Sequence, residues 1–289
     1  MAVAVLLALT TSCLYGVADF LGGIASRRAG GLTVAARSQM VGLPVILLLV
    51  WLVPGRPAAA DLWWGAGTGV AGAVALGLFY QALAVGRISV VAPIAAAVGA
   101  SVPVVVGLAT GERPGALPIL GLGLAIGAII LIGQEVPPEQ ALGAAEASVH
   151  AMNSRRALVL AILAGLAIGA FYTCIRQASA AAGLWPLVAA RAVSLSALFS
   201  TTRIKGLPLR LPRRIALAAG GAGALDIMAN ACYLLAVHRG LLSVVATLAS
   251  LYPAVTVLLA RVVLGERLRR VQIAGIAVGV AGVAMIAAG

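Results

Sequence analysis

Ten apolar segments, each about twenty residues long and with few charges, follow one another along this chain. Lipid cannot hydrogen-bond to a free peptide group, so an apolar stretch of this length spans the bilayer as a helix. The expected helices are residues 2–24, 32–53, 62–85, 89–110, 116–134, 157–179, 185–202, 214–237, 241–263 and 271–288. We therefore predict an all-α integral membrane protein with about ten transmembrane helices.

The composition agrees with a lipid environment. The 289 residues are 62% hydrophobic and 10% charged, and the mean hydropathy is +1.11. A net charge of +12 would suggest nucleic acid as the partner of a soluble chain. Here the basic residues gather in loops between apolar segments, where they set membrane orientation instead. We expect the lipid bilayer, and no nucleic acid, as a partner.

The second half of the chain is a diverged copy of the first. Residues 79–132 align with residues 233–286 at an offset of 154 without a gap, and 14 of the 54 pairs are identical. The same offset places residues 35–37 on residues 189–191. Five helices in each copy is an odd number, so the second copy enters the membrane from the opposite side. We expect two inverted five-helix repeats, residues 1–134 and 157–289, joined by a linker at residues 135–156.

The loop charges predict an orientation. The first, third, fifth, seventh and ninth loops hold 13 Lys or Arg residues, and the other loops hold three. Basic loops stay in the cytoplasm, so both termini are expected outside. The single Lys and the abundance of Arg, Ala, Gly and Val are typical of a GC-rich bacterial genome. The expected location is therefore the bacterial plasma (inner) membrane, as a multi-pass protein.

These features resemble the EamA-like family of the drug/metabolite transporter superfamily, whose halves each repeat a five-helix unit. The residues that carry the resemblance are Tyr15-Gly16 with a weaker copy at Ile168-Gly169, the paired Arg37 and Arg191, and the matched turns at residues 111–113 and 265–267. The resemblance covers essentially the whole chain and implies a transporter of a small-molecule solute. It does not identify the solute, since the superfamily moves amino acids, sugars, nucleotide sugars, cations and drugs. Members are commonly given cytoplasmic termini, opposite to the orientation that the loop charges predict.

A polar stripe in segment 214–237 is the first candidate for a substrate site. Asn230 and Tyr233 follow Asp226 at i+4 and i+7, which places all three on one helix face. An ionisable side chain at membrane depth is costly, so such groups are functional candidates. We expect the stripe to line a hydrated cavity, with an interhelical hydrogen-bond network as the alternative. Asp226 is the candidate for proton coupling.

A second stripe, Thr11, Tyr15 and Asp19, lies in segment 2–24. Asp19 and Arg37 approach the same membrane face, so an ion pair between them is expected, and a gating or substrate role is the alternative.

Three further side chains complete the set of substrate-binding candidates. Tyr172 is expected to form a wall of the cavity, as is Tyr15. Arg176 is expected to bind a carboxylate of the solute or to snorkel to the interface. Tyr80 either contacts the solute or makes an interhelical hydrogen bond.

Other recurring residues favour structural or gating roles. Arg37 and Arg191 occupy matched positions, and Glu112 and Glu266 recur in tight turns, where a carboxylate can cap the next helix. Small residues four apart, at Gly65 and the residues 69, 123, 127, 275 and 279, allow close helix packing within the chain. A homodimer seam is the alternative for these glycines.

No set of residues assembles an enzyme, a metal site or a cofactor site. The sequence has no phosphate-binding loop of the Walker type, and its two His and three Cys residues show no ligand spacing. We therefore expect a secondary active transporter, an exporter of a small metabolite, amino acid or drug-like solute by alternating access, with proton coupling. The alternative is a membrane-embedded enzyme or lipid-handling protein that uses the same cavity.

Overall fold

The computed structural model describes residues 2–109, 115–132, 144–239, 245, 248–265 and 270–288. Every regular element within these ranges is helical. The helices are α1 (Ala2–Ala29), α2 (Gly31–Leu52), α3 (Ala59–Val85), α4 (Ile88–Ala109), α5 (Ala116–Ile132), α6 (Ala144–Arg176), α7 (Trp185–Ile204), α8 (Arg213–Val237), α10 (Tyr252–Leu264) and α11 (Arg270–Ala288), with a short 3-10 helix at Ala180–Ala182. The predicted all-helical class is confirmed.

Length and composition make five of the described helices candidates to cross a membrane, and these are α1, α2, α3, α6 and α8. Shorter apolar helices occur within α4, α10 and α11. The predicted segment 241–263 is described as a helix only from Tyr252 onward, because most of the residues before it lie outside the described ranges. The helical membrane architecture therefore follows the apolar segments.

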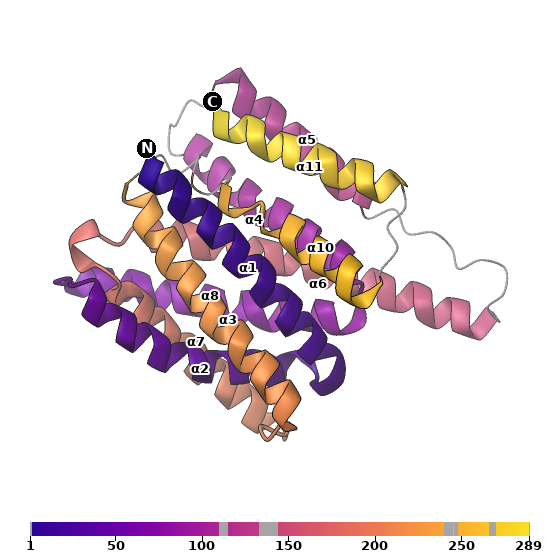
Figure 1. Cartoon of the computed structure of the whole chain (residues 1–289), viewed down its shortest axis with the longest axis horizontal. Coiled ribbons are helices and arrows are strands. Elements are labelled where there is room, and N and C mark those ends of the chain that lie inside the picture. The colour runs from indigo at the N-terminus through magenta and orange to yellow at the C-terminus, as the bar shows by residue number, and fades with distance from the viewer. Residues whose placement is uncertain are drawn as a thin grey trace.

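Helix α6 begins earlier than the apolar pattern predicts. It has 33 residues, which corresponds to about 50 Å at 1.5 Å per residue, and only Met152–Arg176 has the composition of a span. Residues 144–156, assigned to the predicted linker, are thus its first turns. Figure 1 shows this end of α6 extending beyond its neighbours.

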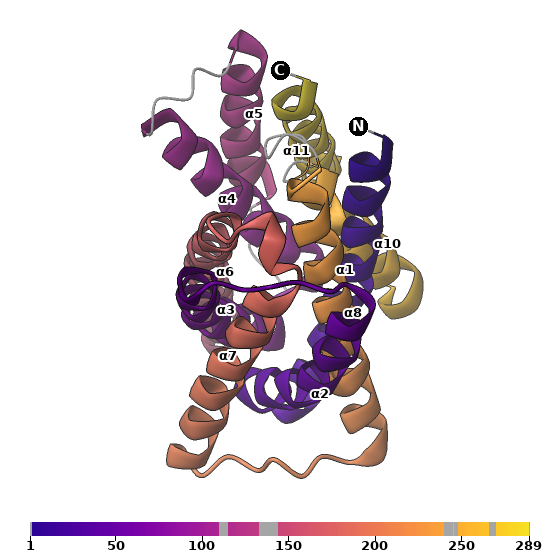
Figure 2. The same cartoon turned by 90° about the vertical axis from the view of Figure 1, so that its left-hand side faces the viewer.

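The helices pack in pairs that join the two halves of the chain. Helix α1 packs on α8 and α10, while α3 packs on α6 and α7. Helix α2 packs on α7 and α8, and α4 packs on α6. Helices α5 and α11 pair with each other at the edge of the bundle and reach the remainder chiefly through α4 (Figures 1 and 2). Helix α1 begins and α11 ends at the same end of the bundle (Figure 1).

Small residues permit the closest of these contacts. A Cβ atom added at Gly65 or Gly69 of α3 would collide with the backbone of α7, and one added at Gly223 of α8 would collide with the backbone of α2 at Ser38. Intramolecular packing is therefore confirmed for the α3 pair. An added Cβ at Gly123 or Gly127 of α5 would meet no atom, so a dimer seam on that helix stays a prediction.

At one end of the bundle a carboxylate ties the α2–α3 loop to the α6–α7 loop. The Asp61 side chain accepts hydrogen bonds from the backbone N–H of Ala58 (2.8 Å) and from the backbone N–H (2.7 Å) and hydroxyl (3.1 Å) of Ser179. The Arg56 N–H also donates to the Ala181 carbonyl at 2.8 Å. Asp61 is 4% exposed, so these bonds satisfy a carboxylate that has little contact with solvent.

Candidate functional site

A cavity of about 90 Å³ lies in the middle of the bundle. Helices α1, α2, α3, α6, α7, α8 and α10 contribute side chains to it, so both halves of the chain line it. Since a buried water needs roughly 10–15 Å³ of such space, the cavity has room for several waters or for part of a small solute. Polar groups gather on one side of it and apolar groups on the other.

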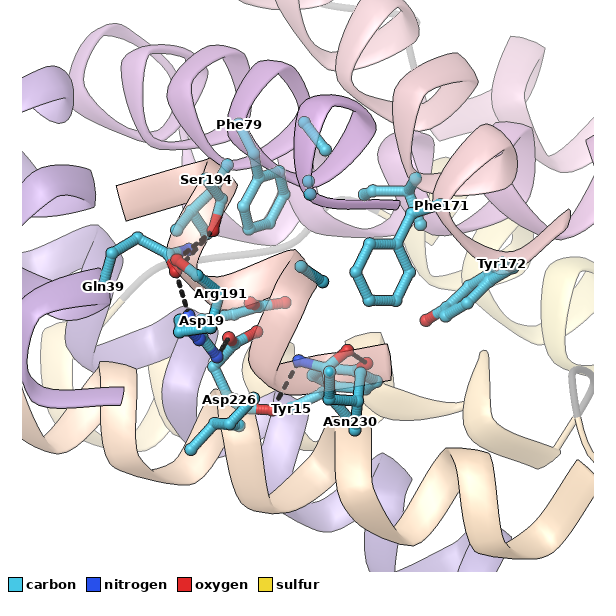
Figure 3. A pocket seen from close by; sticks show the side chains of 18 of the residues that line it. Tyr15, Asp19, Gln39, Phe79, Phe171, Tyr172, Arg191, Ser194, Asp226 and Asn230 are labelled. Atoms are coloured by element: carbon cyan, nitrogen blue, oxygen red, sulfur yellow. Dashed lines mark hydrogen bonds and ion pairs between the residues drawn. The ribbon is translucent and has the colours of Figure 1, made fainter. Parts of the chain in front are cut away.

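The polar side is centred on an ion pair between α7 and α8. The Arg191 guanidinium donates to the Asp226 carboxylate at 2.7 Å (Figure 3). Arg191 also donates to the Gln39 side-chain oxygen on α2, which accepts a second bond from the Ser194 hydroxyl at 3.0 Å. Arg191 is 4% exposed and the Asp226 side chain 20%. The guanidinium is therefore almost fully buried, while the carboxylate remains open to the cavity.

A second polar link joins α1 to α8. The Tyr15 hydroxyl donates to the Asn230 side-chain oxygen at 2.8 Å, and the Asn230 amide nitrogen donates to the Asp226 backbone carbonyl at 2.7 Å. Tyr15 also packs edge-on against Tyr252 of α10, with ring centroids 5.8 Å apart. The predicted cavity lining and the alternative hydrogen-bond network thus involve the same residues.

The opposite side of the cavity is apolar. It includes Leu76 and Phe79 of α3 together with Ile168 and Phe171 of α6. Figure 3 shows the rings of Phe79 and Phe171 across the cavity from Asp226 and Asn230. Positions 72, 76 and 79 are the copies of the polar stripe 226, 230 and 233 at the offset of 154. Two of these matched pairs, 72 with 226 and 76 with 230, therefore line one cavity with opposite chemistry.

Five of the eight predicted substrate-binding residues line the cavity, namely Tyr15, Asp19, Tyr172, Asp226 and Asn230. The helical spacing that suggested the two stripes accounts for four of them.

The other three predicted residues do not line it. Tyr233 stacks on Tyr172 with ring centroids 4.6 Å apart, behind the cavity wall. Tyr80 is buried against Gly22 and Gly31. Arg176 is exposed at the end of α6.

Arg37 does not form the expected ion pair with Asp19. Its guanidinium instead lies 3.9 Å from the Met40 sulfur. The matched Arg191 pairs with Asp226, but the offset of 154 places a glycine, Gly72, where Arg37 would need an acid. Repeat symmetry therefore does not provide Arg37 with an equivalent ion pair. Glu112 and Glu266 lie outside the described residues.

Sequence reasoning missed Gln39 and Ser194, which complete the polar side, and Phe79, Phe171 and Tyr252 among the aromatic lining. A buried guanidinium needs several acceptors. A polar side chain inside a neighbouring apolar segment, such as Gln39, was the available signal. Within the described ranges, no group of three His, Cys, Asp or Glu side chains has a metal-binding arrangement.

Comparison with known proteins finds a similarity of the second half of the chain to a transporter family. The profile of the EamA-like transporter family matches residues 155–288. No curated protein sequence matches the chain. A protein of known crystal structure resembles it with a TM-score of 0.65 at 16% identity, over 98% of this chain and 96% of the other. That similarity concerns the fold alone. The family match agrees with the predicted resemblance over the second half of the chain, and the apolar helices agree with a multi-pass membrane protein.

Proposed function

We propose that this chain, whose residues 155–288 belong to the EamA-like transporter family of the drug/metabolite transporter superfamily, is a secondary active transporter that binds its solute in the central cavity. The observation that carries the proposal is the position of the cavity. It lies at the middle of apolar helices, is lined from both halves of the chain, and places polar groups opposite apolar ones. A site between two repeats can open to either side when one repeat rocks against the other.

The helix contacts support two inverted repeats, residues 1–134 and 157–289. The offset of 154 exchanges α1 with α6, α2 with α7, α3 with α8 and α5 with α11. Under that exchange the contact of α1 with α8 becomes that of α6 with α3, and the contact of α2 with α8 becomes that of α7 with α3. The α5–α11 and α2–α7 contacts map onto themselves. Such an arrangement has two halves that can exchange conformations.

Rocking of the halves would act on the polar links that cross between them. The Tyr15–Asn230 and Arg191–Gln39 hydrogen bonds each join one half to the other. We propose that these bonds rearrange as the cavity changes the side to which it opens, which couples solute binding to the conformational change.

The finer proposal is export driven by proton entry, with Asp226 as the coupling group. In the described conformation the Asp226 carboxylate is paired with the Arg191 guanidinium at 2.7 Å. We propose that a proton replaces Arg191 as the partner of Asp226 during transport, which ties coupling to rearrangement of α7 against α8. The inward proton gradient of a bacterial plasma membrane would then drive the solute outward.

A blocked cavity tests the proposal. Leu76→Trp places an indole in the cavity, whereas Val74→Trp, two residues along α3, places it on a face that is 49% exposed and outside the cavity lining. Both proteins are reconstituted in sealed vesicles and assayed for uptake of radiolabelled 2-phenylethylamine, phenylalanine and glucose. We expect flux of at least one compound with the wild type and Val74→Trp, and its loss with Leu76→Trp.

Equal flux with both Trp variants would contradict the cavity as the route. Chemical conversion of a compound without its translocation would instead favour the enzyme alternative. A homodimer is not needed for this assay, because the cavity is complete within one chain.

A further inference from the structure

The charges that face the cavity do not balance. Two carboxylates, Asp19 and Asp226, line it, but Arg191 is the one cationic side chain among its lining residues. Arg191 is engaged by Asp226 at 2.7 Å. With both carboxylates ionised, the described lining carries one net negative charge, and that charge resides at Asp19.

Asp19 has no protein partner among the described residues. It makes no hydrogen bond or ion pair there, and Arg37, which the sequence suggested as its partner, contacts Met40 instead. Figure 3 shows Asp19 beside Arg191 and Asp226 at the polar side of the cavity. A carboxylate with little access to solvent is stabilised by a cation, and the cation among the described lining residues, Arg191, is already paired with Asp226.

Aromatic rings surround the remainder of the cavity. Tyr15, Phe79, Phe171, Tyr172 and Tyr252 contribute to its lining. The faces of such rings attract a cation within about 6 Å of the ring centroid, and their edges and the neighbouring aliphatic side chains accommodate an apolar group. The site thus offers a negative charge for a cationic head and an apolar wall for a tail.

We propose that Asp19 binds the positively charged head of the solute, and that the solute is a small organic amine with an apolar or aromatic tail and without a carboxylate. This inference rests on the proposed function, since it names the solute class for the same cavity. A free carboxylate on the solute would face Asp19 and Asp226, while Arg191 is already engaged by Asp226 and Gln39. Amines are thereby favoured over amino acids and over carboxylic acids.

Four probes that share a phenyl ring and a short chain isolate the charge. 2-Phenylethylamine is cationic, 2-phenylethanol is neutral, phenylalanine is zwitterionic and 3-phenylpropionate is anionic. Binding to the purified full-length protein is measured by titration calorimetry in detergent at pH 7 for the wild type, Asp19→Asn and Asp19→Glu. The neutral alcohol is the matched control, because its binding reports the apolar wall and the integrity of the fold without the charge.

We expect the wild type to bind the amine at least about tenfold more tightly than the other three probes, as for a desolvated charge pair. Asp19→Asn should reduce amine affinity at least about tenfold, to the level of the alcohol, and leave alcohol affinity unchanged. Asp19→Glu should restore part of the preference, because it restores the charge.

Three results would overturn the inference: amine affinity unchanged in Asp19→Asn, phenylalanine or 3-phenylpropionate binding as tightly as the amine, or no amine binding by the wild type. Each of them leaves the proposed function to be decided separately. If phenylalanine or glucose is transported and Leu76→Trp blocks that transport, the proposed transporter function and the cavity as its route are supported. The amine is then excluded as the solute.

Discussion

Removing either partner of the Arg191–Asp226 ion pair should destabilise the protein, but the loss of stability should differ between the two partners. Asp226→Asn leaves a guanidinium that is 4% exposed and cannot lose its proton. Removing one partner of a buried pair costs about 3–5 kcal/mol for this reason. Arg191→Gln instead leaves a carboxylate that is 20% exposed to the cavity, where water or a proton can compensate it. Its loss should therefore be smaller, about 1–3 kcal/mol.

The assay is thermal unfolding of purified protein in detergent. A loss of 3–5 kcal/mol corresponds to a decrease in Tm of roughly 6–20 °C for a domain of this size, and the smaller loss to a proportionally smaller decrease. The double variant should be more stable than the sum of the single losses predicts, since it leaves no isolated charge. The same cycle in an Asp19→Asn background prevents Arg191 from recruiting the other cavity carboxylate.

An equal decrease in Tm for Arg191→Gln and Asp226→Asn, or additive losses in the double variant, would contradict this prediction. Either result would mean that the pair is hydrated in solution and that burial of Arg191 does not determine its cost. Size-exclusion profiles of the variants show whether the proteins compared are folded and monodisperse.

Three further outcomes are expected. Asp226→Asn should abolish the dependence of flux on a pH gradient, measured in vesicles; flux that still follows the gradient would remove Asp226 from coupling. Asp61→Ala should lower stability by about 1–3 kcal/mol, because it leaves the Ser179 N–H without its acceptor. Ser179→Ala removes one 3.1 Å hydrogen bond and should cost about 0.5–1.5 kcal/mol. Equal Tm values for the two variants would contradict this order. Burial holds the pKa of His238, just after α8, below its ordinary value. The folded state therefore favours neutral imidazole, and stability should decrease as pH falls below about 6.5. His238→Gln should reduce that decrease, and an unchanged pH profile of Tm in this variant would contradict the role of His238.

The helices were predictable because lipid imposes a strict demand on the backbone. Apolar segments of sufficient length had to become helices, and they did so near the expected ends. The first turns of α6 were not predictable from this demand. Residues 144–156 include Glu146, Arg155 and Arg156 and lie outside any apolar run, so a hydrophobic pattern gives no sign that the helix starts there.

The polar half of the cavity was partly predictable and the apolar half was not. Helical spacing placed Asp226 and Asn230 on one face. Because a polar side chain is costly in lipid, that face was expected to line a cavity. Phe79 and Phe171 gave no such signal, since an apolar residue that lines a cavity looks like one that faces lipid. The pairing of Arg191 with Asp226 depends on how α7 packs on α3 and α2 through small residues, which the sequence distance between them does not reveal.

The claim that the cavity alternates between the two sides of the membrane is tested most directly by thiol accessibility. A protein in which Cys13, Cys174 and Cys232 are replaced by Ser receives one new thiol, Ser194→Cys, in the cavity lining. A membrane-impermeant maleimide is added to right-side-out and to inside-out vesicles. We predict labelling from both sides and slower labelling when a transported solute is present. Labelling from one side alone, with or without solute, would contradict alternating access through this cavity.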